Sequence, residues 1–117
     1  MKQNIIKEKS FDFALQIISL YKNIAEQKKE FVLSKQLLRS GTSIGALVRE
    51  AEQAESKADF IHKLSISLKE ANESEYWLEL LYRSEYIEFE SYNTLNGKLA
   101  ELLRLLTSII KSAKNNK

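Results

Sequence analysis

The pentapeptide Gly41-Thr42-Ser43-Ile44-Gly45 matches G-x-S-x-G, the pattern that presents a nucleophilic serine on a sharp strand-to-helix turn in many hydrolases. That chemistry needs a strand before the serine and an acid–base partner beside it. Here the flanking apolar residues keep a helical spacing, and no plausible partner accompanies them. The sequence therefore favours a structural role for Ser43.

The acidic residues and the single histidine are the other candidate ligands. Asp59-x-x-His62 resembles half of a di-iron motif that requires Glu-x-x-His on each of two helices, so one copy cannot build that site. Glu50, Glu52 and Glu55 form with Asp59 a solvated acidic cluster, with an adventitious cation site as the alternative. Because the chain also lacks cysteine and a phosphate-cradling glycine loop, we predict no catalytic residue, metal or cofactor.

The composition of the chain favours helices. Its 117 residues suffice for a single domain spanning 1–117, and a chain with no proline and only three glycines lacks the residues that hairpins use. No apolar run approaches the roughly 18 to 20 residues of a membrane span. No apolar stretch of signal-peptide length follows the first residues, so we expect a cytoplasmic protein with no membrane partner.

The apolar spacing predicts an all-α protein, an up-down-up-down antiparallel four-helix bundle. The four predicted helices cover about residues 10–27, 31–54, 57–83 and 89–113. Ser10 is the predicted N-cap of the first helix and Ser56 that of the third, where Asp59 gives a variant of the capping box. Asn96-Gly97 interrupts the last helix and predicts a weak point near its start, because the flanks keep a helical period.

Two glycines one turn apart predict a close helix contact. An interior glycine costs a helix about 0.5 to 1 kcal/mol relative to alanine, so Gly41 and Gly45 on one face indicate packing that offsets this loss. We interpret the pair as a sign of assembly and not of catalysis. Antiparallel pairing of the second and third helices brings Arg39 level with Glu73, which predicts an ion pair from Arg39 to Glu73 or to Glu70.

Charge is segregated along the chain. Residues 1–49 carry a net +5, residues 50–97 a net −7 and residues 98–117 a net +4. The helices also carry more apolar residues than one core stripe needs, namely Phe11, Ile18, Ile66, Trp77, Leu80, Leu103 and Ile110. A wide core stripe and solvated helix faces explain these features without a partner. A protomer with unlike charged flanks also fits a head-to-tail homo-oligomer that closes into a ring.

The segments QLLRSGTSIGA and DFIHKLSISLKEANESEYWLELL, with Glu50-Ala51 between them, resemble the four-helix-bundle family encoded in intervening sequences of bacterial 23S ribosomal RNA genes. The resemblance implies a homopentameric ring without known enzyme activity. It extends to accessory proteins of diversity-generating retroelements, which bind nucleic acid and work with a reverse transcriptase. Leu47 is a departure, because many relatives carry asparagine there.

The positions that match the family pattern are interpreted as structural. They are Arg39, Ser40, Gly41, Ser43, Gly45, Glu50, Asp59, Glu70, Glu73, Tyr76 and Trp77.

Two classes of function remain open after the resemblance. The first is a nucleic-acid-binding ring, in which repetition around a symmetry axis multiplies a weak net charge of +2 per chain. Its predicted RNA- or DNA-binding residues are Lys22, Lys28, Lys29, Arg104, Lys111, Lys114 and Lys117. The second is a structural or protein-interaction scaffold, with a reverse transcriptase or another protein as its partner and no direct contact to nucleic acid.

Overall fold

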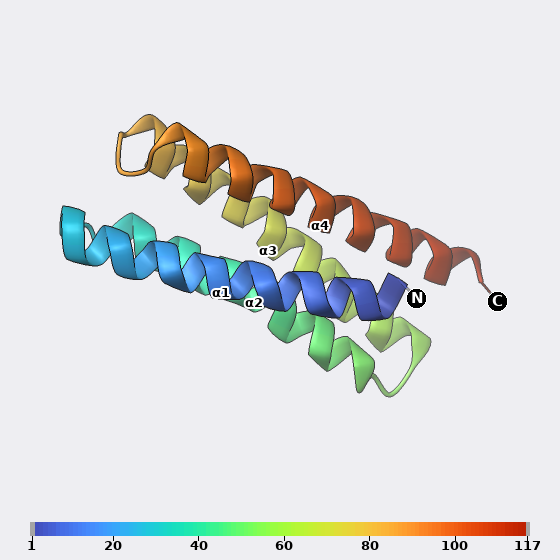
Figure 1. The fold of residues 1–117 in the computed structure, drawn as a ribbon. Helices are drawn as coiled ribbons and strands as arrows, with labels where there is room; N and C mark the ends of the chain where they lie inside the picture. Colours follow the sequence, from blue (N-terminus) through green and yellow to red (C-terminus); the bar gives the residue numbers. More distant parts are fainter. Residues whose placement is uncertain (1, 117) are drawn as a thin grey trace.

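The computed structural model describes residues 2–116, with side chains from Asn4 onward. Its four helices are α1 (Lys2–Lys28), α2 (Val32–Glu52), α3 (Lys57–Arg83) and α4 (Phe89–Asn115). Consecutive helices run antiparallel, and α4 returns beside α1, so the predicted up-down-up-down bundle is confirmed (Figure 1). The backbones of α1 and α3 lie on one diagonal and do not approach each other closely, nor do those of α2 and α4.

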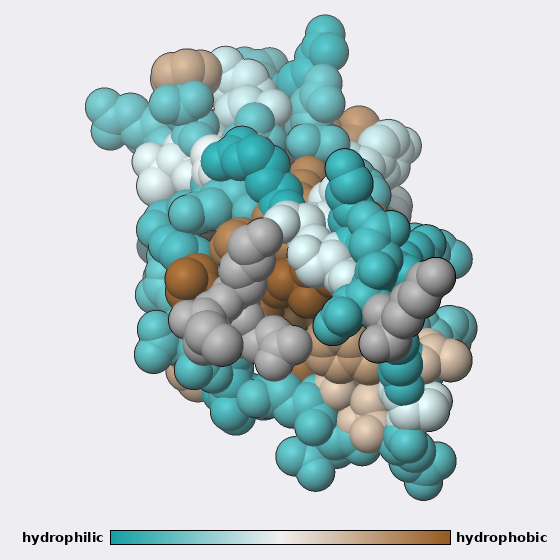
Figure 2. Space-filling view, turned by 90° about the vertical axis from the view of Figure 1, so that its right-hand side faces the viewer, coloured by the Kyte–Doolittle hydropathy of each residue, from teal (hydrophilic) through white to brown (hydrophobic). Residues whose placement is uncertain are grey.

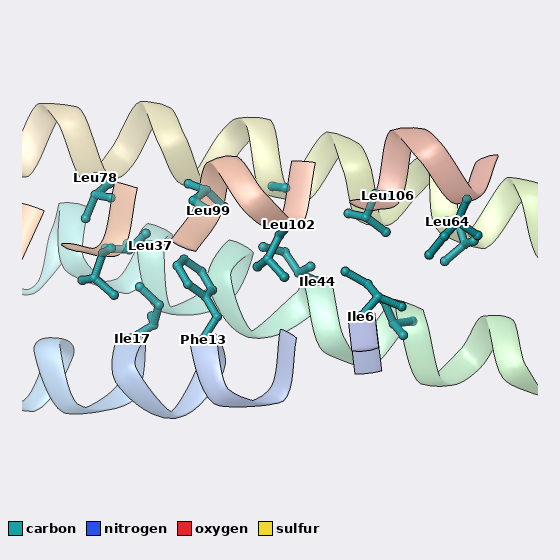
Figure 3. Close-up of a cluster of buried hydrophobic side chains, with 14 of the residues drawn as sticks. Ile6, Phe13, Ile17, Leu37, Ile44, Leu64, Leu78, Leu99, Leu102 and Leu106 are labelled. Carbon is teal, nitrogen blue, oxygen red and sulfur yellow. The ribbon is translucent and has the colours of Figure 1, made fainter. Parts of the chain in front are cut away.

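The bundle is a rod of 50 × 21 × 19 Å. We call the end where α1 begins and α4 ends the terminal end, and the end with the connections at 29–31 and 84–88 the turn end (Figure 1). Because each helix presents apolar residues three and four apart, one continuous core fills the axis, including Phe13, Ile17, Ile44, Leu78, Leu99 and Leu102 (Figure 3).

Figure 2 shows the terminal end of the bundle, where apolar side chains are visible inside a hydrophilic rim. The small hollow between Ile6, Phe60, Leu64 and Ile109 holds only about 10 Å³. A space of this size is at the lower limit of what one water molecule occupies, so it is a packing gap and not a ligand site.

The first helix begins before residue 10, and the predicted N-cap role of Ser10 is wrong. Ser10 lies inside α1 with 0% of its surface exposed, and its hydroxyl donates to the carbonyl of Lys7 at 3.2 Å. Ile6, one turn earlier, is 1% exposed and extends the buried stripe towards the N-terminus. Burial of this extra turn outweighs the preference of serine for a helix terminus.

A carboxylate that the sequence reading overlooked caps α2. Glu30 accepts hydrogen bonds from the backbone N–H groups of Val32, Leu33 and Ser34 at 2.8 to 2.9 Å. Partial burial raises the pKa of Glu30, but these three donors outweigh burial and hold the pKa below its ordinary value. The negative charge also complements the positive end of the helix dipole.

Replacement of Glu30 by alanine should destabilise the bundle by about 1 kcal/mol at neutral pH, because three N–H groups lose their acceptor. The pKa of Glu30 is depressed in the fold, so its contribution is present above the unfolded value of about 4.3 and is lost as the pH falls through the folded value. Urea unfolding of both proteins at pH 7 and near pH 3 measures this. An equal stability difference at both pH values would contradict the capping role.

The sequence-based predictions for α3 and α4 agree with the structure to different degrees. Ser56 is the N-cap of α3, and its hydroxyl accepts from the N–H of Asp59 at 3.0 Å, as predicted. The acid of the capping box returns to the N–H of Glu55 instead of Ser56. In α4 the helix runs through Asn96 and Gly97 without interruption, and a Cβ on Gly97 would meet nothing within 4 Å.

Candidate interaction surfaces

The two glycines of α2 form the predicted close contact, and its partner is α1 of the same chain. A Cβ on Gly41 would lie 3.1 Å from both γ carbons of Ile17. One on Gly45 would lie 3.3 Å from the hydroxyl oxygen of Ser10. The glycines therefore serve packing inside the protomer, which corrects their interpretation as a sign of assembly.

Buried serines let α3 approach α2 from the other side. Ser67 is fully buried and its hydroxyl donates to the carbonyl of Ile44 across the interface at 2.9 Å. The hydroxyls of Ser74 and Ser40 lie 2.8 Å apart, and that of Ser74 also lies 2.8 Å from the carbonyl of Glu70. Small side chains whose polar groups are all bonded allow close packing without a desolvation penalty.

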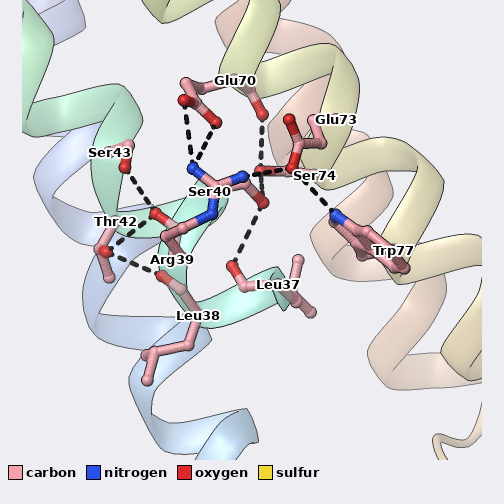
Figure 4. A network of polar contacts seen from close by, with 10 residues as sticks. All are labelled: Leu37, Leu38, Arg39, Ser40, Thr42, Ser43, Glu70, Glu73, Ser74 and Trp77. Carbon is pink, nitrogen blue, oxygen red and sulfur yellow. Dashed lines mark hydrogen bonds and ion pairs between the residues drawn. The ribbon is translucent and has the colours of Figure 1, made fainter. Parts of the chain in front are cut away.

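Arg39 joins α2 to α3 on the outside of this seam (Figure 4). Its guanidinium pairs with Glu70 at 3.2 Å and also with Glu73, so the predicted register is confirmed. The hydrogen bond to Glu70 raises the pKa of Arg39. The Arg39 side chain is 49% exposed, so the pair is a surface ion pair and not a buried one.

Replacement of Arg39 by alanine should cost about 1 kcal/mol or less, because exposed ion pairs are worth little even in a forked geometry. Thermal unfolding in low and high salt measures this cost. The difference between the two proteins should shrink as salt screens the pair. A loss of about 3 kcal/mol that salt does not change would show a buried role instead.

The same network fixes an aromatic pair on α3. The indole N–H of Trp77 donates to the carboxylate of Glu73 at 3.2 Å, while Arg39 holds that carboxylate from α2. The ring of Tyr76 meets Trp77 edge-on at 5.0 Å and is 58% exposed. The sequence reading missed this link, although Glu73 and Trp77 stand four residues apart, the spacing of neighbours on a helix. The Tyr76 ring thus stands on the surface beside the partly buried ring of Trp77, whose orientation the hydrogen bond to Glu73 fixes.

A second exposed apolar surface lies on α1. Phe11 is 50% exposed and Leu15 is 52% exposed. The guanidinium of Arg49, from α2, stands 5.1 Å from the centre of the Phe11 ring, so this surface is apolar with a basic neighbour. Of the surplus apolar residues, Ile110 belongs to the core at 8% exposure, and Trp77 and Leu103 pack against it in part.

The predicted nucleic-acid-binding residues form two groups and not one. Lys22, Lys28 and Lys29 are exposed on α1 and the following connection near the turn end. Arg104, Lys111 and Lys114 are exposed on α4 towards the terminal end. The part of α4 from its start to Lys111 spans about 33 Å, so one protomer does not join the groups. Lys117 lies outside the described residues.

None of the six described basic side chains pairs with a carboxylate within residues 2–116. They are therefore available to an anionic partner.

The residues that resembled catalytic or metal sites have structural partners. Ser43 lies inside α2, and its hydroxyl donates to the carbonyl of Arg39 at 2.6 Å, so the strand and turn of a nucleophile elbow are absent around it. Glu50 pairs with Lys63 at 3.2 Å, and Glu52 pairs with Lys7 at 3.2 Å. No group of three metal-binding side chains occurs in the part of the chain that the structure describes.

No helix among residues 2–116 is long and apolar enough to span a bilayer.

Comparison with known proteins places the chain in a family. Residues 2–108 match the 23S rRNA-intervening sequence protein family. A crystal structure of a protein of unknown function from the S23 ribosomal protein family of Bacteroides thetaiotaomicron is similar, with 62% identity and a TM-score of 0.94. The match covers 95% of this chain and 99% of that one. No curated protein matches the sequence. The chain therefore belongs to the 23S rRNA-intervening sequence protein family.

Proposed function

We propose that the protein is a non-catalytic subunit of a homo-oligomeric ring, a pentamer by family resemblance, which binds nucleic acid through basic surfaces repeated around the ring. The observation that carries the proposal is the pair of unlike exposed faces on opposite diagonal helices. The α3 face has the exposed Tyr76 with the partly buried Trp77 beside it, and the α1 face has the exposed Phe11 and Leu15.

Both faces present apolar or aromatic side chains, and they are complementary in charge. Glu75 and Glu79 are exposed on α3, while Arg49 stands over Phe11 beside α1. Tryptophan, tyrosine and arginine carry much of the binding energy of protein interfaces, and side chains fixed before contact lose less entropy on binding. Contact between unlike faces is heterologous and closes into a ring when its rotation permits.

Nucleic-acid binding in such a ring rests on unpaired basic side chains. Lys111 and Lys114 on α4 have no carboxylate partner among the described residues. A ring repeats each of them once per protomer, so a modest charge on one chain becomes a band of charge that phosphates neutralise. Binding of this kind is electrostatic and weakly specific for sequence.

A titration of the intact oligomer with structured RNA and with duplex DNA at low salt tests this function. We expect binding that weakens steeply with salt, because each phosphate contact releases a condensed counterion. Charge reversal at Lys111, Lys114 and Lys117 should make the salt dependence shallower. No detectable binding to either nucleic acid would contradict the proposal.

A protein-interaction scaffold is the second candidate, and the orientation of Trp77 favours it. An indole locked by Glu73 and Arg39 suits protein contact, and no base-reading motif accompanies it. A stable oligomer that binds neither RNA nor DNA would favour this scaffold.

A further inference from the structure

A long groove opens between α1 and α4 near the turn end. Two adjoining hollows of about 580 and 570 Å³ share Leu20, Asn23 and Ser91 in their linings. Among the neighbouring helix pairs, α1 and α4 make the least extensive contact. The ion pairs Lys9–Glu101 and Lys98–Asp12 join these helices beyond the groove, towards the terminal end. The groove is thus a local opening of an otherwise bridged seam.

Groups able to bind a ligand line this groove. The side chains of Asn23, Ser91 and Lys28 make no hydrogen bond or ion pair within the described residues. The ring of Tyr86 packs in part against the core and stacks on no other ring among those residues. Tyr82 differs, because its ring stacks on Tyr92 with centroids 4.4 Å apart. An aromatic ring, a lysine and an amide therefore face one shared space.

We propose that this groove binds a stretch of single-stranded nucleic acid, with a base stacked on Tyr86 and the phosphate backbone beside Lys28. This inference rests on the proposed function and names the strand form and the site. Unpaired bases can turn outward to stack on aromatic side chains and hydrogen-bond through their edges, whereas bases in a duplex cannot. Asn23 and Ser91 supply donors and acceptors for those edges.

The charges on the two sides of the groove determine which side the phosphate backbone follows. Lys28 lines the α1 side, and Lys22 and Lys29 are exposed near it on the same segment. Glu85 and Glu88 line the opposite side, where they repel phosphate, and the guanidinium of Arg83 on that side is paired with Glu79 at 3.3 Å. The phosphate backbone of the strand therefore follows the α1 side of the groove, and the bases point towards Tyr86 and α4.

Binding of a fluorescently labelled ten-nucleotide single strand to the intact protein, followed by anisotropy, tests the site. Replacement of Tyr86 by leucine should weaken binding about fivefold or more, because one stacked base is lost. Tyr86→Phe keeps the ring and should bind as the native protein does. Lys28→Ala should lower the slope of log affinity against log salt by about 0.7, the value for one phosphate of a single strand.

Lys69→Ala is the matched control, since Lys69 is exposed on α3, diagonal to α1, and should leave the slope unchanged. Circular dichroism confirms that each variant is folded. If the native protein binds the strand but Tyr86→Leu and Lys28→Ala bind it equally well, the groove is not the site and the proposed function stands. If the protein binds duplex but not the single strand, the groove is likewise not the site and the proposed function stands. If it binds no nucleic acid, both the groove site and the proposed function are overturned.

Discussion

Leucine in place of Gly45 is expected to destabilise the bundle by about 3 kcal/mol or to prevent its folding, because overpacking a filled helix contact forces backbones apart. The backbone carbonyl carbon and oxygen of Ser10 lie 3.4 Å from where a Cβ would stand, so a branched side chain has no space. Such a loss is a large part of the 5 to 15 kcal/mol that stabilises a typical domain. Denaturant unfolding with circular dichroism measures it.

Alanine at the three glycines provides the matched series. Gly41→Ala should destabilise, because the new methyl group would meet two carbons of the fully buried Ile17 at 3.1 Å. Gly97→Ala should stabilise by about 0.5 to 1 kcal/mol, since that position is helical and open. If all three substitutions stabilised the protein equally, the close contact between α1 and α2 would not exist.

Glutamate at both Phe11 and Leu15 is expected to convert the proposed oligomer into a folded monomer. The two acids would face the acidic α3 surface of the next protomer and would remove the apolar contact. The native side chains are about half exposed, so the monomer itself should lose little stability. Light scattering gives the mass, and circular dichroism reports the fold.

Val32→Glu is the control for this double variant, because Val32 is 73% exposed at the start of α2, away from Phe11. It should leave the mass unchanged. An oligomer that survived glutamate at both Phe11 and Leu15 would show that the α1 face is not part of the interface.

Local patterns in the sequence predicted much of the bundle because they depend on spacing alone. The helical period located four helices, and the serine–acid pair at Ser56 and Asp59 located the start of α3. The same counting predicted the Arg39 pairing with Glu73, since antiparallel neighbours joined by a short connection share one register.

Features set by tertiary packing were not predictable in this way. Ser10 reads as a cap in isolation, but the stripe that includes Ile6 buries it in mid-helix. The sequence indicated that Gly41 needs a close neighbour and could not show that the neighbour is Ile17 of the same chain. Likewise, Lys28 and Lys111 look like one basic set until the antiparallel course of α1 and α4 separates them.

The native mass of the purified protein, measured by light scattering at micromolar concentration, decides whether the chain assembles. Assembly through the α1 and α3 faces predicts a mass several times the 13.5 kDa of one chain, and five times that mass for the pentamer. A single species of 13.5 kDa at micromolar concentration would contradict assembly through these faces.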